Sequence, residues 1–196
     1  LQDPHPPLFQ PFASSERSIR WCAQEGVTAI LPPLHPVLEQ RLTDLYAEGF
    51  TPELSAWEHE HHLDPPDTKF RVVPDVAGHA DDLRWCDALV LVYPTWWSGQ
   101  PGMLKGWIDR VWVSGVVYDL PEGANRIRPL LRNVRRLVVV TTHGSSKWIN
   151  TLQGEGGKRV AFRGLRVLCH PLARSKWMAM YTVDRSTPAD RERFLA

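Results

Sequence analysis

The stretch LVLVYPTWWSGQPGMLKGWIDRVW, residues 89–112, decides the expected fold because it joins a strand pattern to a helix pattern. Residues 88–94 form a continuous apolar run rich in β-branched residues, which is typical of a strand that helices bury on both faces. After Pro101 the apolar residues recur at helical spacing, and Lys105 and Asp109 form an i,i+4 pair. The stretch therefore predicts a buried strand, a turn and a helix.

Two adjacent tryptophans, Trp96 and Trp97, occupy the turn between these two patterns. Most tryptophans are core or subunit-contact residues, because burying an aromatic side chain is strongly favourable. A turn at the carboxyl end of a buried strand is a different place, since ligands of open α/β sheets bind there. We therefore interpret the two indoles as the wall of a site for a flat ligand, with core or dimer packing as the alternative.

Strand and helix patterns alternate along most of the remaining chain. We predict helices over 75–86 and 158–172, buried strands over 136–144 and 177–183, a loop or hairpin over 115–133, and a tail helix after Thr187. Strands that alternate with helices predict an α/β fold with a parallel sheet. In such a sheet the strand ends YPTWWSG and TTHGSS should lie side by side.

The two strand ends together offer the groups that a flavin ring requires. PTWW supplies flat apolar rings, and TTHGSS supplies hydroxyls, an imidazole and a glycine where backbone can approach a ligand closely. A flavin needs an apolar wall on one face and N–H donors at the edge where negative charge gathers on reduction. The residue types therefore favour a flavin site.

Composition and charge argue against several other classes of protein. The net charge of +1 gives neither a basic face for nucleic acid nor an acidic tail. No apolar run approaches the roughly 18 residues of a membrane span, and the N-terminus lacks a secretory pattern. Cys22, Cys86 and Cys169 are far apart, so we expect neither a metal pair nor a disulfide framework, and we expect a cytoplasmic protein.

The motif YPTWWSGQPGMLKGWIDRVW resembles the signature of the NAD(P)H dehydrogenase (quinone) family. These flavodoxin-like flavoenzymes include the mammalian quinone reductases and the bacterial ancillary proteins of potassium-efflux systems. The resemblance extends to TDLYAEGFTPELS, CDALVLVYP and RRLVVVTTHGS, and it covers residues 41–196, about four-fifths of the chain. We therefore divide the chain into a divergent or aberrant segment, 1–40, and a flavin-binding domain, 41–196.

The resemblance implies a doubly wound parallel sheet with helices on both faces, and FMN or FAD bound at the strand ends. The cofactor-binding residues that it implies are Pro94, Thr95, Trp96 and Trp97 along the isoalloxazine, and Thr141, Thr142, His143 and Gly144 at the pyrimidine side. NAD(P)H would pass a hydride to flavin N5, and a quinone-like acceptor would then take two electrons. The resemblance also implies a homodimer with the site at the subunit boundary.

The first strand and the phosphate loop of the family are missing or replaced in this sequence. The family opens with a strand, a loop of the type H-P-x-x-x-S-F and a helix, which hold the flavin phosphate. Here that region reads PFASSERSIR, with no His-Pro pair and no apolar strand before it. Either residues 1–40 come from a shifted reading frame or rearranged gene start, or VTAIL is a replacement strand with Ser14, Ser15 or Ser18 as weak phosphate ligands. We favour the first, because the change to family-like sequence is abrupt, and we expect weak flavin retention.

A second departure concerns catalysis. The mammalian enzymes carry a tyrosine and a histidine after their T-T-G-G motif, which help to settle charge on the reduced flavin. Here Trp148 or Ile149 stands in the place of the tyrosine, and Glu155 or Gly156 in the place of the histidine. We therefore assign no catalytic acid or base from the sequence.

Two weaker patterns are interpreted as structural. EHEHH, residues 58–62, could bind a metal, because the imidazole of His59 can share a helix face with that of His61 or His62, but no cysteine or distant histidine completes a set. We expect a solvated helix there and no metal site.

GEGGKR, residues 154–159, resembles the tail of a phosphate loop but lacks a strand before it and a Ser or Thr after the lysine. We expect a mobile loop over the substrate.

The leading functional hypothesis is a flavin-dependent NAD(P)H:quinone oxidoreductase. A one-electron carrier of the flavodoxin type is disfavoured, because such carriers are strongly acidic and this chain has a net charge of +1. A regulatory flavoprotein subunit of a potassium-efflux system and an inactive family remnant are the remaining alternatives.

Overall fold

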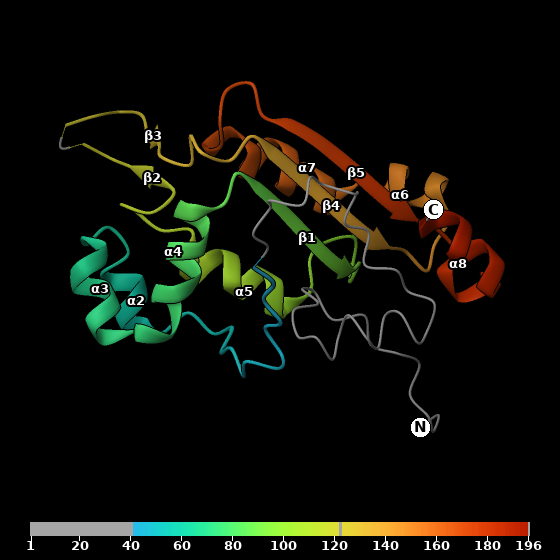
Figure 1. Cartoon of the computed structure of the whole chain (residues 1–196), viewed down its shortest axis with the longest axis horizontal. Helices are drawn as coiled ribbons and strands as arrows, with labels where there is room; N and C mark the ends of the chain where they lie inside the picture. The colour runs from blue at the N-terminus through green and yellow to red at the C-terminus, as the bar shows by residue number, and fades with distance from the viewer. Residues whose placement is uncertain (1–40, 122, 196) are drawn as a thin grey trace.

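A computed structural model describes residues 41–121 and 123–195 of the chain (Figure 1). Its centre is a parallel sheet with the strand order β1-β4-β5. The strands are β1 (Ala88–Pro94), β4 (Arg136–Thr142) and β5 (Arg174–Met180). The predicted α/β class with a parallel sheet is confirmed. The expectations for residues 1–40, a missing or replaced first strand and phosphate loop, lie outside the described residues.

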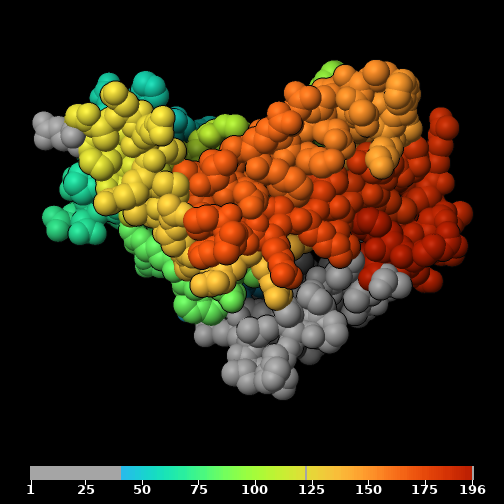
Figure 2. Space-filling model, turned by 90° about the horizontal axis from the view of Figure 1, so that it is seen from above, coloured from blue at the N-terminus to red at the C-terminus, as the bar shows by residue number. Residues whose placement is uncertain are grey.

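Helices and one hairpin connect the strands. Before β1 the chain forms α2 (Ala56–Glu60), α3 (Pro66–Val72), η1 (Pro74–Val76) and α4 (Ala77–Trp85). Between β1 and β4 lie α5 (Gly102–Val111) and the antiparallel pair β2 (Tyr118–Asp119) and β3 (Arg128–Pro129). After β4 come α6 (Lys147–Leu152), α7 (Gly156–Arg159), η2 (Val160–Leu165) and η3 (Arg166–Leu168), and after β5 come η4 (Val183–Arg185) and α8 (Pro188–Leu195). Figure 2 shows the hairpin and α8 at opposite ends of the molecule. No helix in the described ranges combines the length and apolar character needed to cross a bilayer.

The register of the sheet brings the strand ends to one edge. Tyr93 lies opposite Thr141, and Pro94 lies opposite Thr142, which in turn lies opposite Met180 of β5. Because the strands are parallel, their carboxyl ends share this edge. The chain leaves the edge in three places, directly after β1, β4 and β5.

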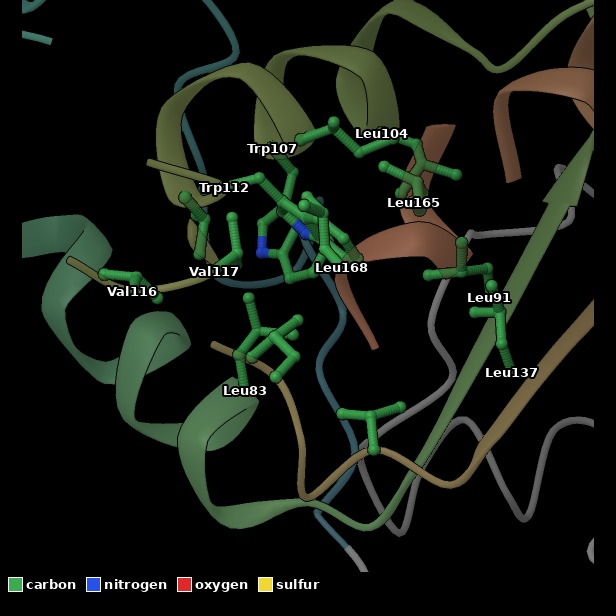
Figure 3. Packing of buried hydrophobic residues seen from close by; sticks show 14 of the residues in the cluster. Leu83, Leu91, Leu104, Trp107, Trp112, Val116, Val117, Leu137, Leu165 and Leu168 are labelled. Atoms are coloured by element: carbon green, nitrogen blue, oxygen red, sulfur yellow. The ribbon is translucent and has the colours of Figure 1, made fainter. Parts of the chain in front are cut away.

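The buried core lies against one face of the sheet. Leu91 of β1 and Leu137 of β4 are fully buried and share this face, because alternate residues of paired strands point the same way. Leu83 of α4, Leu104 of α5 and Leu165 of η2 belong to the same cluster (Figure 3). The packed helices therefore give the strand ends a rigid base.

Reciprocal side-chain caps fix the starts of α2 and α8. The Ser55 hydroxyl accepts a hydrogen bond from the N–H of Glu58, whose carboxylate accepts one from the N–H of Ser55. Thr187 and Asp190 form the same pair at the start of α8. Such capping boxes satisfy donors that a helix start leaves unpaired. The predicted tail helix is confirmed.

A buried arginine joins α5 to the segments that precede β1. The guanidinium of Arg110 donates to Glu58 at 2.7 Å and to both carboxylate oxygens of Asp75, at 2.7 and 3.2 Å. It also donates to the carbonyl oxygen of Thr51 at 2.6 Å and lies 5.2 Å from the centre of the Phe50 ring. The side chains of Arg110 and Glu58 are each only 5% exposed. Both charges are thus removed from water, and the guanidinium is paired with two carboxylates, those of Glu58 and Asp75.

The two described cysteines are free thiols that pack against the core. The Sγ of Cys86 donates to the carbonyl oxygen of Leu83, and that of Cys169 donates to Leu165, each at 3.6 Å. Burial raises the pKa of each thiol to about 11. At neutral pH both side chains are therefore protonated.

Two predicted boundaries are wrong. The last strand, predicted over 177–183, is β5 at 174–180, so Tyr181 follows the strand. Its first residues are polar and exposed, so a search for apolar runs in the sequence does not detect them. The helix predicted over 158–172 starts earlier, with α7, and its helical run ends at Leu168, because Cys169 adopts an extended conformation. The hairpin within 115–133 is confirmed.

Helix α5 lies closest to the preceding chain at Gly106. A Cβ at this position would lie within 2.6 Å of the Cα of Pro52. We expect Gly106→Ala to lower the free energy of unfolding by about 2 kcal/mol, because backbone must move to make room. Gly102→Ala in the same helix is the control, since a Cβ there meets open space. Chemical denaturation of both variants measures the difference, and equal effects would contradict the packing.

The Glu58–Arg110 pair predicts a loss of stability in acid. Burial alone would raise the pKa of Glu58, but the hydrogen bonds from Ser55 and Arg110 outweigh it and lower the pKa. The stabilisation is therefore fully present above the ordinary glutamate pKa of about 4.3 and is lost as the pH falls through the lower folded-state pKa. Glu58→Gln should cost about 3 kcal/mol at pH 7 and weaken this acid dependence. Urea unfolding at a series of pH values measures this loss of stability and its dependence on acid. Glu60→Gln is the control, because Glu60 is exposed on the same helix. An unchanged acid dependence in Glu58→Gln would refute the assignment.

Candidate functional site

The ends of β1 and β4 contact each other directly. The backbone N–H of Thr95 donates to the carbonyl oxygen of Thr142 at 2.9 Å, and the hydroxyls of Thr95 and Thr141 are 2.9 Å apart. The Oγ1 of Thr95 also lies 3.5 Å from Nε2 of His143. The predicted adjacency of the two segments is confirmed. Thr95, Thr141 and His143 form what we call the strand-end cluster.

The aromatic turn projects away from the core. Trp96 and Gly99 exchange backbone hydrogen bonds of 3.1 and 2.9 Å, and the two residues between them, Trp97 and Ser98, have φ angles of +46° and +62°. Trp97 is 100% exposed and Trp96 is 58% exposed. Left-handed backbone costs a non-glycine residue about 1 kcal/mol. The turn thus holds two large apolar rings outside the core, and the alternative that they are core residues is wrong.

The other predicted residues lie at the same edge. Pro94 and Thr142 are the last residues of β1 and β4 and lie opposite each other. Gly144 comes so close to Asp184 that a Cβ on the glycine would lie 2.6 Å from the carboxylate Oδ2. Within the described ranges, the backbone N–H groups of Trp97 and Gly144 donate no hydrogen bond. Ser14, Ser15 and Ser18 lie outside the described residues.

His143 is buried beneath Tyr181. The imidazole is 6% exposed, and the two rings stack with centroids 4.8 Å apart and planes 14° from parallel. The backbone N–H of His143 donates to Met180 at 2.7 Å, which fixes the ring position from β5. Burial lowers the pKa of His143, while Asn150 and Glu155 act in the opposite direction. The net shift favours the neutral imidazole.

The segment between α6 and α7 packs against the aromatic turn. The hydroxyl of Ser98 donates to Gln153 at 2.7 Å, and the carbonyl oxygen of Ser98 accepts from the N–H of Gly157 at 2.9 Å. Gln100 donates to the carbonyl oxygen of Gly157 at 3.1 Å. The mobile loop predicted over 154–159 is therefore wrong for residues 156–159, which form α7 and are bonded to the turn.

Glu155 and Tyr181 belong to the site although the sequence did not single out Tyr181. Glu155 has a φ of +47°, and its carboxylate pairs with Lys158 at 3.0 Å and accepts from the Tyr181 hydroxyl at 3.4 Å. Tyr181 was hidden because the predicted strand ran past it. The available signal is its place directly after the third parallel strand, where side chains reach the ligand edge.

In the histidine-rich stretch, the ring centroids of His59 and His62 lie 6.2 Å apart, but His62 lies beyond the end of the helix. Helix α2 ends at Glu60, so His61 and His62 lie beyond it, and His61 stacks on Trp57 with centroids 4.3 Å apart. Over the described part of the chain, no three His, Cys, Asp or Glu side chains are grouped to hold a metal ion.

A cavity of about 250 Å³ lies away from the strand ends, between α2, α3 and α5. Its lining residues are Leu54, Glu58, His59, His62, Lys69, Asp109, Arg110, Trp112, Val113 and Tyr118. None of the predicted cofactor-binding residues lines it. The strand-end cluster and the aromatic turn therefore lie elsewhere on the molecule.

Comparison with known proteins assigns the chain to a family. A family model described as a flavodoxin-like fold matches residues 23–167. The match includes residues 23–40, which the motif resemblance left out, and stops before residue 168. The domain boundary at residue 41 stays a prediction.

Three relatives illustrate the similarity. An uncharacterized NAD(P)H oxidoreductase of Escherichia coli strain K12 is 41% identical over 78 residues, 38% of this chain and 37% of that protein. NAD(P)H dehydrogenase [quinone] 1 of Rattus norvegicus is 29% identical over 127 residues, 59% of this chain and 45% of that protein. The solved NAD(P)H:quinone oxidoreductase from Methanothermobacter marburgensis superposes with a TM-score of 0.60 at 26% identity, covering 78% of this chain and 75% of that one. The alignments thus span less than half the length of these two curated relatives.

The strain in the aromatic turn predicts a stabilising substitution. Trp97→Asn should raise the free energy of unfolding by about 1 kcal/mol, because asparagine tolerates left-handed backbone and the indole makes no core contact. Trp148→Asn is the control, since Trp148 is also exposed but lies in helix α6. Thermal unfolding compares the two. A loss of stability in Trp97→Asn would show that the indole packs on something.

Proposed function

This chain belongs to the flavodoxin-like fold family, and from that premise we propose that it is a flavin-dependent NAD(P)H:quinone oxidoreductase. The names of its relatives support the reaction type: an NAD(P)H oxidoreductase, an NAD(P)H dehydrogenase [quinone] and an NAD(P)H:quinone oxidoreductase. The proposal extends that activity to this chain, with FMN or FAD as cofactor, NAD(P)H as electron donor and a quinone-like acceptor.

One observation carries the proposal: exposed indoles and backbone donors without an acceptor share the carboxyl edge of the sheet. Trp96 and Trp97 present flat apolar surface outside the core. The N–H groups of Trp97 and Gly144 have no acceptor within the described residues. A flat ring with acceptor atoms on one edge fits such a pairing, since it covers the indoles and accepts from the amides. The residues present therefore fit an isoalloxazine.

Five of the eight predicted cofactor-binding residues have a task in this proposal. A bound flavin supplies the two-electron chemistry. Pro94 and Thr95 fix the position of the turn at the end of β1. Trp96 and Trp97 provide the apolar wall against which the flavin ring stacks. The amide of Gly144 donates where negative charge develops, and donors are worth most where water is excluded. The protein accelerates the reaction mainly by holding planar partners in contact.

We further infer a homodimer in the cytoplasm, with the site completed at the subunit boundary. The aromatic turn is open to solvent in one chain. Hydride transfer needs water to be kept away from the reacting rings. A second copy seated over the turn would exclude water and bury the exposed apolar surface.

Titration with flavin tests the proposal. Addition of FMN or FAD to the purified protein should quench tryptophan emission with saturation, and Trp97→Asn should weaken the apparent affinity about tenfold, the effect of losing roughly 1.4 kcal/mol of stacking. Trp85→Phe is the matched control, because Trp85 is also exposed but ends α4, before β1 begins. Equal flavin affinity of Trp97→Asn and wild type would contradict the proposal that the Trp97 indole stacks on the flavin.

Steady-state turnover separates the remaining hypotheses. The flavin-loaded protein should oxidise NAD(P)H continuously when a soluble quinone is present. Flavin binding without turnover would favour a regulatory flavoprotein subunit, and no flavin binding would favour an inactive remnant.

A further inference from the structure

Positive charge gathers in one part of the chain, although the whole chain is almost neutral. Residues 123–183 contain twelve of the 23 lysines and arginines but only one of the 22 acidic residues, Glu155. Figure 2 shows this stretch, coloured yellow to orange-red, over most of the face that it presents. The net charge of +1, which argued against a basic face, therefore hides a strong separation of charge along the chain.

Four of these basic side chains lie at the amino edge of the sheet, where β4 and β5 begin. Arg136 lies directly opposite Arg174 in the register of the two strands. Lys176 follows two residues later and therefore points to the same side of the sheet as Arg174. Arg135 directly precedes β4, and all four residues are exposed. We call Arg135, Arg136, Arg174 and Lys176 the basic edge.

The basic edge has no ion-pair partner among the residues that the structure describes. Asp87 lies beside it, directly before β1. The backbone carbonyl oxygen of Asp87, and not its carboxylate, accepts from the N–H groups of Arg135 and Arg136, at 2.7 and 3.2 Å. Like charges placed directly opposite each other destabilise a sheet. The pairing of Arg136 with Arg174 therefore costs stability that an anionic surface would recover.

An exposed leucine lies beside the basic edge in a braced loop. Leu172 is 82% exposed and belongs to the loop between η3 and β5, two residues before Arg174. Its N–H donates to Nδ1 of His170 at 3.1 Å. The guanidinium of Arg166 donates to the carbonyl oxygen of Ala173 at 2.8 and 3.1 Å. These hydrogen bonds hold the loop in place, with an apolar side chain directed into solvent.

We propose that the basic edge and Leu172 dock this protein onto an anionic lipid surface. The guanidinium and ammonium groups lie at the headgroup phosphates, and the leucine enters the acyl boundary. Each basic side chain near an anionic leaflet strengthens binding about fivefold, and an inserted apolar side chain adds to this. Nucleic acid offers the same phosphate charge, but its backbone presents no apolar layer to an exposed leucine. The combination of charge with Leu172 therefore favours lipid.

Docking at the amino edge leaves the candidate site open. Strands β4 and β5 each have seven residues. The amino and carboxyl edges of the sheet are therefore roughly 20 Å apart. Thr95, Thr141 and the aromatic turn lie at the carboxyl edge, so they are directed away from the lipid when the protein is docked. The docking surface does not depend on the proposed function, because it shares no residue with the flavin site.

Sedimentation with lipid vesicles tests the docking. The purified full chain should bind vesicles of mixed phosphatidylglycerol and phosphatidylcholine, and salt should release it, because salt screens the headgroup charge. It should stay unbound with phosphatidylcholine alone. Arg136→Gln/Arg174→Gln should weaken binding about 25-fold, which is about fivefold for each charge removed.

Lys147→Gln/Arg193→Gln is the matched control for charge. It also removes two exposed basic side chains, but from α6 and α8, which follow the carboxyl ends of β4 and β5. This control should bind nearly as well as wild type. Equal losses in the two double variants would contradict a localised docking surface. Urea unfolding checks folding, and Arg136→Gln/Arg174→Gln should be at least as stable as wild type, because like-charge repulsion is removed.

Leucine variants distinguish lipid from nucleic acid. Leu172→Ser should weaken binding to phosphatidylglycerol vesicles about tenfold, because the leucine no longer enters the acyl boundary. Leu152→Ser removes another exposed leucine, from α6, and should bind as wild type does. Unchanged vesicle binding of Leu172→Ser overturns the proposal, and so does tighter binding of wild type to duplex DNA than to the vesicles. Wild type that ignores the vesicles overturns it as well, and flavin binding, measured separately, still decides the proposed function.

Discussion

The buried guanidinium of Arg110 is the contact on which the geometry of the sheet edge depends. It binds Glu58, Asp75 and the backbone of Thr51, so it ties α5 to three points of the segment that precedes β1. The hydrogen-bonded sheet fixes β1 independently. The aromatic turn spans the short distance between these two fixed elements. Because both of its ends are held, the turn can keep Trp97 in a conformation that an isolated peptide would leave.

Much of the fold follows from local pattern. The run at 88–94 is strand β1, the helical spacing after Pro101 is α5, and the cap at Thr187 starts α8. These signals are strong because each element carries its own apolar period or capping pair. Strand β5 was misplaced because its first residues are exposed and polar, and the run after β4 was misjudged because it changes from α to π to 3-10 geometry. Such features arise from tertiary contacts, which no short pattern records.

The site was predictable in outline and not in detail. The rule that parallel strands share a carboxyl edge brings Thr95 and Thr141 together from the sequence alone. The stacking of His143 on Tyr181 was not accessible, because it depends on the side-chain orientation of two residues that follow different strands. The same holds for the hydrogen bond from Gly157 to Ser98, which fixes residues 156–159 against the aromatic turn although their sequence resembles a loop.

The raised pKa values of the two described thiols bear on the quinone chemistry proposed for this protein. Quinones are electrophiles that alkylate thiolates by conjugate addition, and thiols react far more slowly. With pKa values of about 11, Cys86 and Cys169 are present as thiolate in only about one molecule in ten thousand at pH 7. Arylation of these two thiols by the proposed acceptors is therefore suppressed.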